Sequence, residues 1–129
     1  MARQKASNPT DRELEILRVL WEFGPSSVRR VHEYVSTGSD TGYTTTLKFM
    51  QIMLEKGLVT RDTATRTHIY RAAVEEESVQ KSLAADLVEK AFGGSAMKLV
   101  MQALEQKKVP QAELTRIQRM LDELEGEEK

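Results

Sequence analysis

Four polar side chains in the segment 44–59 have the types and spacing that suit contact with DNA: Thr44, Thr45, Lys48 and Gln51. If the segment is helical, Thr45, Lys48 and Gln51 lie on one side of it and Thr44 lies in its first turn. Hydroxyl, ammonium and amide groups can bond to DNA phosphates and to base edges in the major groove. A polar face that only meets water has the same composition, so the interpretation depends on the neighbouring elements.

The opposite side of this segment is apolar. Leu47, Met50 and Leu54 recur at positions i, i+3 and i+7, which is the spacing of a helix side that packs against a small core. We expect Tyr43, at the start of the segment, to belong to the same core. The predicted helix ends at Gly57, because glycine is favoured just after a helix.

A first helix is predicted before this segment. Thr10 and Glu13 form a capping box, in which the Thr10 hydroxyl accepts from the Glu13 amide and the Glu13 carboxylate accepts from the Thr10 amide. The helix stops at Gly24. Its apolar face contains Leu14, Ile16, Leu17, Leu20 and Trp21.

A second helix and a β-hairpin complete this part of the chain. The second helix has the same apolar spacing at Val28, Val31 and Val35. It ends near a loop over residues 37–42. Residues 58–62 and 67–72 carry β-branched side chains around a polar tip, which predicts a hairpin. Three helices and a hairpin in this order predict a winged helix-turn-helix.

Five short stretches resemble, in order, the signatures of the BlaI/MecI/CopY penicillinase-repressor family: Leu14–Trp21, Tyr43–Thr45, Glu55–Val59, His68–Arg71 and Phe92–Ser95. The resemblance implies a mostly α-helical protein with a winged-helix DNA-binding domain over residues 1–73. Residues 74–129 are then a helical dimerisation domain. The implied function is that of a homodimeric, sequence-specific transcriptional repressor on a palindromic operator, and the family's operators are built on TACA and TGTA half-sites.

The resemblance also gives roles to individual residues. It favours contact between DNA and Thr45 and Lys48 over a merely solvated face. Thr44 starts the helix and can contact DNA as well, and Gln51 is open to both interpretations. Arg66 and Thr67, at the tip of the wing, are expected to meet phosphate. Arg29 and Arg30 on the second helix either contact the DNA backbone or only keep that helix soluble, and the sequence leaves both interpretations open.

The C-terminal half reads as three amphipathic helices without a sheet to cover them. Exposed apolar faces of this kind usually mark interaction surfaces, so we expect a second subunit to cover them. The alternative is that these helices pack on their own winged domain. The residues expected in the dimer core are Leu83, Leu87, Phe92, Leu99, Val100, Leu104 and Leu121.

Some members of the family are inactivated by cleavage in the helix that follows Gly93-Gly94. The pair Gln102-Ala103 stands here where those relatives carry Asn-Phe. The resemblance therefore implies release of the repressor by proteolysis near Gln102 and Ala103, and a membrane-sensor metallopeptidase system as a partner.

The formal charge of the chain is −1, but it is unevenly distributed. Residues 1–73 carry 11 lysines and arginines against 8 acidic residues, a net charge of +3, whereas residues 74–129 carry 8 against 12, a net charge of −4. The basic excess therefore lies on the expected DNA-binding domain. With no apolar run near the ~20 residues that span a bilayer, we expect a cytoplasmic protein without membrane insertion.

Catalytic and metal-binding signals are weak. The chain has no cysteine and two histidines, so we expect no disulfide, no metal site and no cofactor. Ser78 and Ser95 each begin an S-x-x-K pattern found in serine acylases, but serine caps helices and S-D-N and K-T-G are missing. His32 begins a zinc-protease-like motif that has Ser36 at its second histidine position. We expect no enzyme, and the main alternative to a repressor is a winged-helix protein-interaction module without sequence-specific DNA binding.

Overall fold

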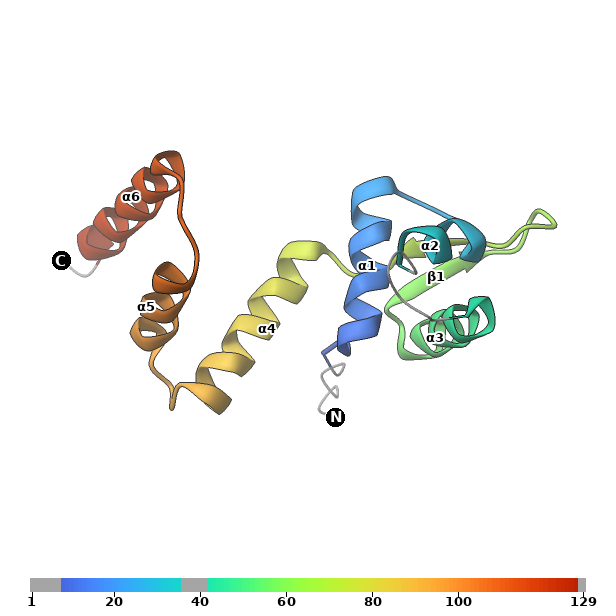
Figure 1. The fold of residues 1–129 in the computed structure, drawn as a ribbon, viewed down its shortest axis with the longest axis horizontal. Helices are drawn as coiled ribbons and strands as arrows, with labels where there is room; N and C mark the ends of the chain where they lie inside the picture. Colours follow the sequence, from blue (N-terminus) through green and yellow to red (C-terminus); the bar gives the residue numbers. More distant parts are fainter. Residues whose placement is uncertain (1–7, 36–41, 128–129) are drawn as a thin grey trace. The chain divides into compact units, whose positions relative to one another are not determined.

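The computed structural model describes residues 8–35 and 42–127, and the chain divides into a first unit, Met1–Ala84, and a second unit, Ala85–Lys129. In chain order the elements are α1 (Asp11–Phe23), α2 (Val28–Val35), α3 (Tyr43–Lys56), β1 (Val59–Asp62), β2 (Ile69–Ala72), α4 (Glu76–Ala91), α5 (Ala96–Gln106) and α6 (Gln111–Glu127) (Figure 1). The loop expected over residues 37–42 lies outside the described residues, apart from Gly42. The boundary after Ala73 stays a prediction.

The capping box that was predicted for α1 is confirmed. The Glu13 amide donates to the Thr10 hydroxyl at 3.3 Å, and the Thr10 amide donates to the Glu13 carboxylate at 3.0 Å. At the other end, Gly24 has a positive φ of 81° and its amide donates to the Leu20 carbonyl at 2.9 Å. Glycine reaches this φ without steric strain, so α1 ends where the sequence predicts.

The core of the first unit lies between α1, α2, α3 and the hairpin. Figure 1 shows these elements gathered together in the first unit. The buried apolar residues are Ile16, Leu17, Val19, Leu20, Val28, Val31, Met50, Met53, Leu58, Val59 and Tyr70. Burying one such large apolar side chain stabilises the fold by about 1.5–3 kcal/mol.

The hairpin is the wing of the fold. β1 and β2 pair antiparallel, with Val59 opposite Ala72 and Asp62 opposite Ile69. Tyr70 also pairs with Ser26, just before α2. The Ser26 amide donates to the Tyr70 carbonyl at 3.0 Å, and the Tyr70 amide donates to the Ser26 carbonyl at 2.8 Å. The base of the wing is therefore fixed to the start of α2. Three helices and this hairpin confirm the predicted winged helix.

Two hydrogen bonds join the start of α4 and the segment before it to the rest of the first unit. The Trp21 indole N–H donates to the Val74 carbonyl at 2.9 Å. The Ser82 hydroxyl donates to the Asn8 amide oxygen at 2.7 Å. The first bond holds the segment before α4, and the second holds α4 itself, so the first part of α4 belongs to the first unit.

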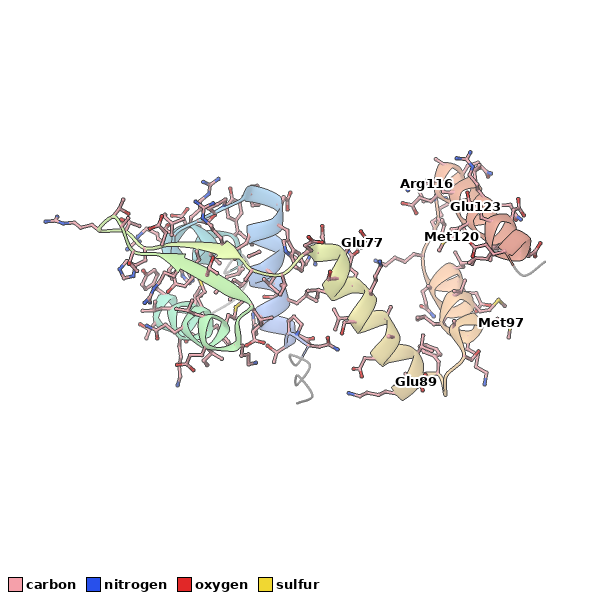
Figure 2. All side chains as sticks on the ribbon, turned by 180° about the vertical axis from the view of Figure 1, so that it is seen from behind. Glu77, Glu89, Met97, Arg116, Met120 and Glu123 are labelled. Atoms are coloured by element: carbon pink, nitrogen blue, oxygen red, sulfur yellow. The ribbon has the colours of Figure 1, made fainter. Side chains whose placement is uncertain are left out.

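The second unit contains the end of α4 together with α5 and α6, and the helices predicted in the C-terminal half are present. Within the described residues, neither α5 nor α6 has a buried side chain. Figure 2 labels Met97 on α5 and Met120 on α6, which are 69% and 62% exposed. None of the helices that the structure describes is long and apolar enough to cross a membrane.

Candidate DNA-binding surface

The four polar residues predicted on α3 are all exposed: Thr44, Thr45, Lys48 and Gln51. We call them the reading face. The other side of α3 carries Met50 and Met53, which are fully buried. The helical period of 3.6 residues separates the two sides, so the core fixes α3 with its polar side outward. The structure brings the four residues together, and their contact with DNA stays a prediction.

The C-terminal end of α3 is fixed by an ion pair between the buried Glu13 carboxylate and the partly exposed Lys56 side chain. The Lys56 ammonium lies 3.0 and 2.9 Å from the two Glu13 carboxylate oxygens, and Glu13 is only 2% exposed. Burial raises the pKa of the Glu13 carboxyl, but the Thr10 amide, the Lys56 ammonium and the Thr10 hydroxyl outweigh it, so the pKa lies below its usual value. The same carboxylate therefore caps α1 and fixes α3.

The N-terminal end of α3 contacts α2. The His32 ring nitrogen Nδ1 lies 2.9 Å from the hydroxyl oxygen of Thr46, which is 1% exposed. His32 also meets the Tyr43 ring edge-on, with ring centroids 5.8 Å apart. The Arg29 guanidinium lies over the face of the same ring, 5.4 Å from its centroid. A cation in this place is attracted by the electrons of the ring face.

Tyr43 corrects one expectation. We expected it in the core, but it is 40% exposed and contacts Arg29 and His32. The apolar spacing of α3 predicts burial of Tyr43, but Tyr43 is the first residue of the helix. At this end α2 covers only part of the ring, and the rest of it meets solvent. His32 is half-buried, and its partner Thr46 is a buried polar residue, as Glu13 and Ser26 are.

A groove of about 530 Å³ runs between the start of α2, the start of α3 and the wing. The residues that line it include Arg29, Tyr43, Arg66, Thr67 and His68. The wing residues predicted to meet phosphate therefore lie beside the first turn of α3. Within the described lining there are two arginines and no carboxylate, so the groove suits an anion. Sequence reasoning left Arg29 undecided and missed His68 as a lining residue.

The residues predicted for dimerisation differ in exposure. Leu83, Phe92, Leu99 and Leu104 are half-buried, whereas Leu87, Val100 and Leu121 are 46%, 47% and 49% exposed. Leu83 lies in the first unit and the other six lie in the second. Their role in a dimer stays a prediction.

The residues predicted for cleavage and the two serines lie on helices. Gln102 and Ala103 are exposed within α5. Ser95 caps α5, because its hydroxyl accepts from the Lys98 amide at 3.2 Å, which confirms the capping interpretation. For Ser78 that interpretation is wrong, since Ser78 lies inside the first turn of α4 after two glutamates, whose charges favour a helix N-terminus.

Comparison with known proteins identifies the family. The model of the penicillinase repressor family matches residues 9–123. The structure of the DNA-binding domain of the repressor BlaI is similar at 22% identity and a TM-score of 0.50, over 57% of this chain and 90% of that one. The monomeric form of Bacillus licheniformis BlaI in complex with the blaP half-operator is similar at 21% identity and a TM-score of 0.50, over 58% of this chain and 92% of that one.

None of the curated proteins matches this chain. The two BlaI structures are less than 25% identical to it, so they support the winged-helix fold rather than any residue's role. The family match covers most of the chain, including α4, α5 and most of α6. This chain therefore belongs to the penicillinase repressor family.

Proposed function

We propose that this chain is a homodimeric repressor that binds a palindromic operator through the reading face and the groove beside it. The observation that carries the proposal is the arrangement of exposed polar groups around the first turn of α3. Thr44, Thr45 and Lys48 point to solvent on a helix whose other side is buried. Arg29 and Arg66 line the adjoining groove.

The two parts of this surface have different tasks. A helix of this kind enters the major groove, where hydroxyl, ammonium and amide groups meet base edges. The arginines of the groove meet phosphates on the strand beside it, which fixes the register of the helix but carries no sequence information. The complex of BlaI with a half-operator supports the choice of DNA as the partner.

Dimerisation is the second part of the proposal. The second unit exposes Met97, Val100 and Met101 on α5 and Leu121 on α6. A second copy of the chain would bury these side chains and link two reading faces. Linked reading faces bind two half-sites with an avidity that one face cannot reach. The half-sites of helix-turn-helix dimers lie about 34 Å apart, one turn of DNA.

Release by proteolysis is the third part. Gln102 and Ala103 lie in α5, and a cut there would divide the proposed dimerisation domain. A helical bond must open locally before a protease can reach it, so cleavage at this place requires local opening of α5. Immunoblots through an induction course test this part: full-length protein that persists while the target genes switch on would exclude cleavage.

Selection from a random-sequence duplex library tests DNA binding without knowledge of the operator. We expect the full-length protein to select palindromes with half-sites resembling TACA and TGTA. Affinity for the selected duplex should exceed affinity for a scrambled duplex by ~10³-fold or more, and both affinities should fall as salt rises. Enrichment of no sequence would instead favour a winged-helix protein-interaction module.

A further inference from the structure

Among the residues that the structure describes, no side chain caps the first turn of α3. Its N-cap is Gly42, and backbone bonds run from the amides of Thr45 and Thr46 to the Gly42 carbonyl at 3.1 and 3.2 Å. Helices that begin without a capping side chain fray more easily at that end. Yet this turn carries Thr44 and Thr45 of the reading face. Contacts from outside the helix therefore contribute to the stability of this turn.

His32 supplies those contacts from α2. It bonds the buried Thr46 hydroxyl and meets the edge of the Tyr43 ring, while Arg29 covers the face of that ring. Tyr43 and Thr46 are the residues on either side of Thr44 and Thr45 in the chain. Residues of α2 therefore contact the first turn of α3 immediately before and immediately after the two threonines.

We infer that His32 is a positioning residue, which sets the first turn of α3 through Thr46 and Tyr43 so that Thr44 and Thr45 reach base edges. This inference rests on the proposed function. Base-edge bonds demand well-defined distances and directions, whereas attraction between cations and phosphates tolerates displacement. Loss of the His32 contacts should therefore lower discrimination between DNA sequences more than it lowers affinity for DNA in general.

Substitutions of the two bonded residues separate the hydrogen bond from the ring contact. His32→Phe keeps a ring beside Tyr43 but leaves the Thr46 hydroxyl without its partner. Thr46→Val removes the hydroxyl and keeps the shape of the buried side chain. His32→Asn restores a polar atom near the position of Nδ1 without the ring. Thr60→Val makes the change of Thr46→Val on an exposed strand residue and serves as the control.

The measurement is the ratio of affinities for the library-selected duplex and for a scrambled duplex of the same composition. We expect His32→Phe and Thr46→Val each to lower this ratio about tenfold, and the double variant to lower it no further, because both remove the same bond. His32→Asn should recover most of the loss, and Thr60→Val should change nothing. A destabilised variant is still informative, since the folded fraction cancels in the ratio.

Amide hydrogen exchange of the free protein gives a second, independent result. In His32→Phe the amides of Thr45 and Thr46 should exchange faster, while the amides in the middle of α1 keep their protection. A ratio unchanged by His32→Phe and Thr46→Val, measured on a duplex that the unmodified protein selects, would overturn the positioning role and leave the proposed function intact. Failure to select any duplex would overturn the proposed function and this inference with it.

Discussion

The two units of this chain differ in how their apolar side chains are covered. In the first unit, Leu17, Val31, Met50 and Met53 are completely buried. In the second unit, the described residues of α5 and α6 include no buried side chain. Met97 and Met120, both labelled in Figure 2, are more than 60% exposed.

This difference teaches that the two units depend on different partners. The helices and the hairpin of the first unit each have an apolar face, and these faces meet within one chain. The helices of the second unit have apolar faces too, but the described part of the same chain leaves many of those side chains in water. We therefore propose that the first unit is stabilised by its own core and the second by a second copy.

The largest effect is expected from charges placed on the second unit. Val100→Asp together with Leu121→Asp would put carboxylates into the proposed dimer core, where an unpaired charge is costly. Sedimentation should show a monomer, and affinity for the selected duplex should fall by about 10²–10⁴-fold as avidity is lost. Thr115→Asp, at an exposed polar position of α6, is the control. A double variant that stays dimeric would contradict the assignment of the interface.

The next effect concerns the core of the first unit. Leu17→Ala removes a fully buried side chain and should lower the free energy of unfolding by about 2–5 kcal/mol. Urea unfolding followed by the fluorescence of Trp21, the single tryptophan, reports on this unit. Leu121→Ala, the matched change in the second unit, should alter the same transition by less than about 0.5 kcal/mol at protein concentrations where the chain is monomeric. Equal effects of the two changes would contradict the division into independently stabilised units.

Much of the fold could be predicted because its signals are local. The capping box at Thr10 and Glu13 and the glycine after α3 each act within a few residues of the chain. The apolar spacing of Leu47, Met50 and Leu54 also separates the core side of α3 from its polar side. The exposure of the four residues of the reading face therefore followed from helical periodicity.

The contacts that sequence reasoning missed join residues far apart in the chain. Glu13 was predicted only as a cap, but packing of α1 against α3 brings Lys56 to it across 43 positions. Tyr43 was predicted in the core because it stands at the start of the apolar side of its helix, four residues before Leu47. Its pairing with Arg29 depends on how α2 packs against α3. Chain spacing contains no information about such crossings.

The ion pair between Glu13 and Lys56 gives a prediction of intermediate size. Glu13→Gln should lower the free energy of unfolding by about 1.5–3 kcal/mol near neutral pH, because it removes hydrogen bonds to a charged group. The pKa of Glu13 is lowered in the folded protein, so its contribution is present above the pKa of an unfolded glutamate and is lost as the pH falls through the folded value.

Urea unfolding at several pH values checks this prediction. The unmodified protein should lose stability on acidification relative to Glu13→Gln, so that the two converge at low pH. Glu15→Gln, which changes an exposed glutamate of the same helix, should show little of this effect. A difference between the proteins that stays constant from neutral to acidic pH would contradict an ionised Glu13 in the fold.

The smallest effect on DNA binding is expected from substitutions of single lysines. Comparing one lysine in each unit tests whether the first unit alone contacts DNA. Lys48→Ala in the reading face should lower discrimination between selected and scrambled duplexes by about 1–3 kcal/mol if Lys48 meets a base. If it meets only a phosphate, affinity for both duplexes should fall alike, and the slope of log affinity against log salt should decrease by about one. Lys98→Ala makes the same change at an exposed position of α5 and should alter neither quantity. Binding measured at several salt concentrations separates these outcomes, and a Lys48→Ala protein that matches the unmodified one in affinity, discrimination and salt slope would remove Lys48 from the DNA-binding surface.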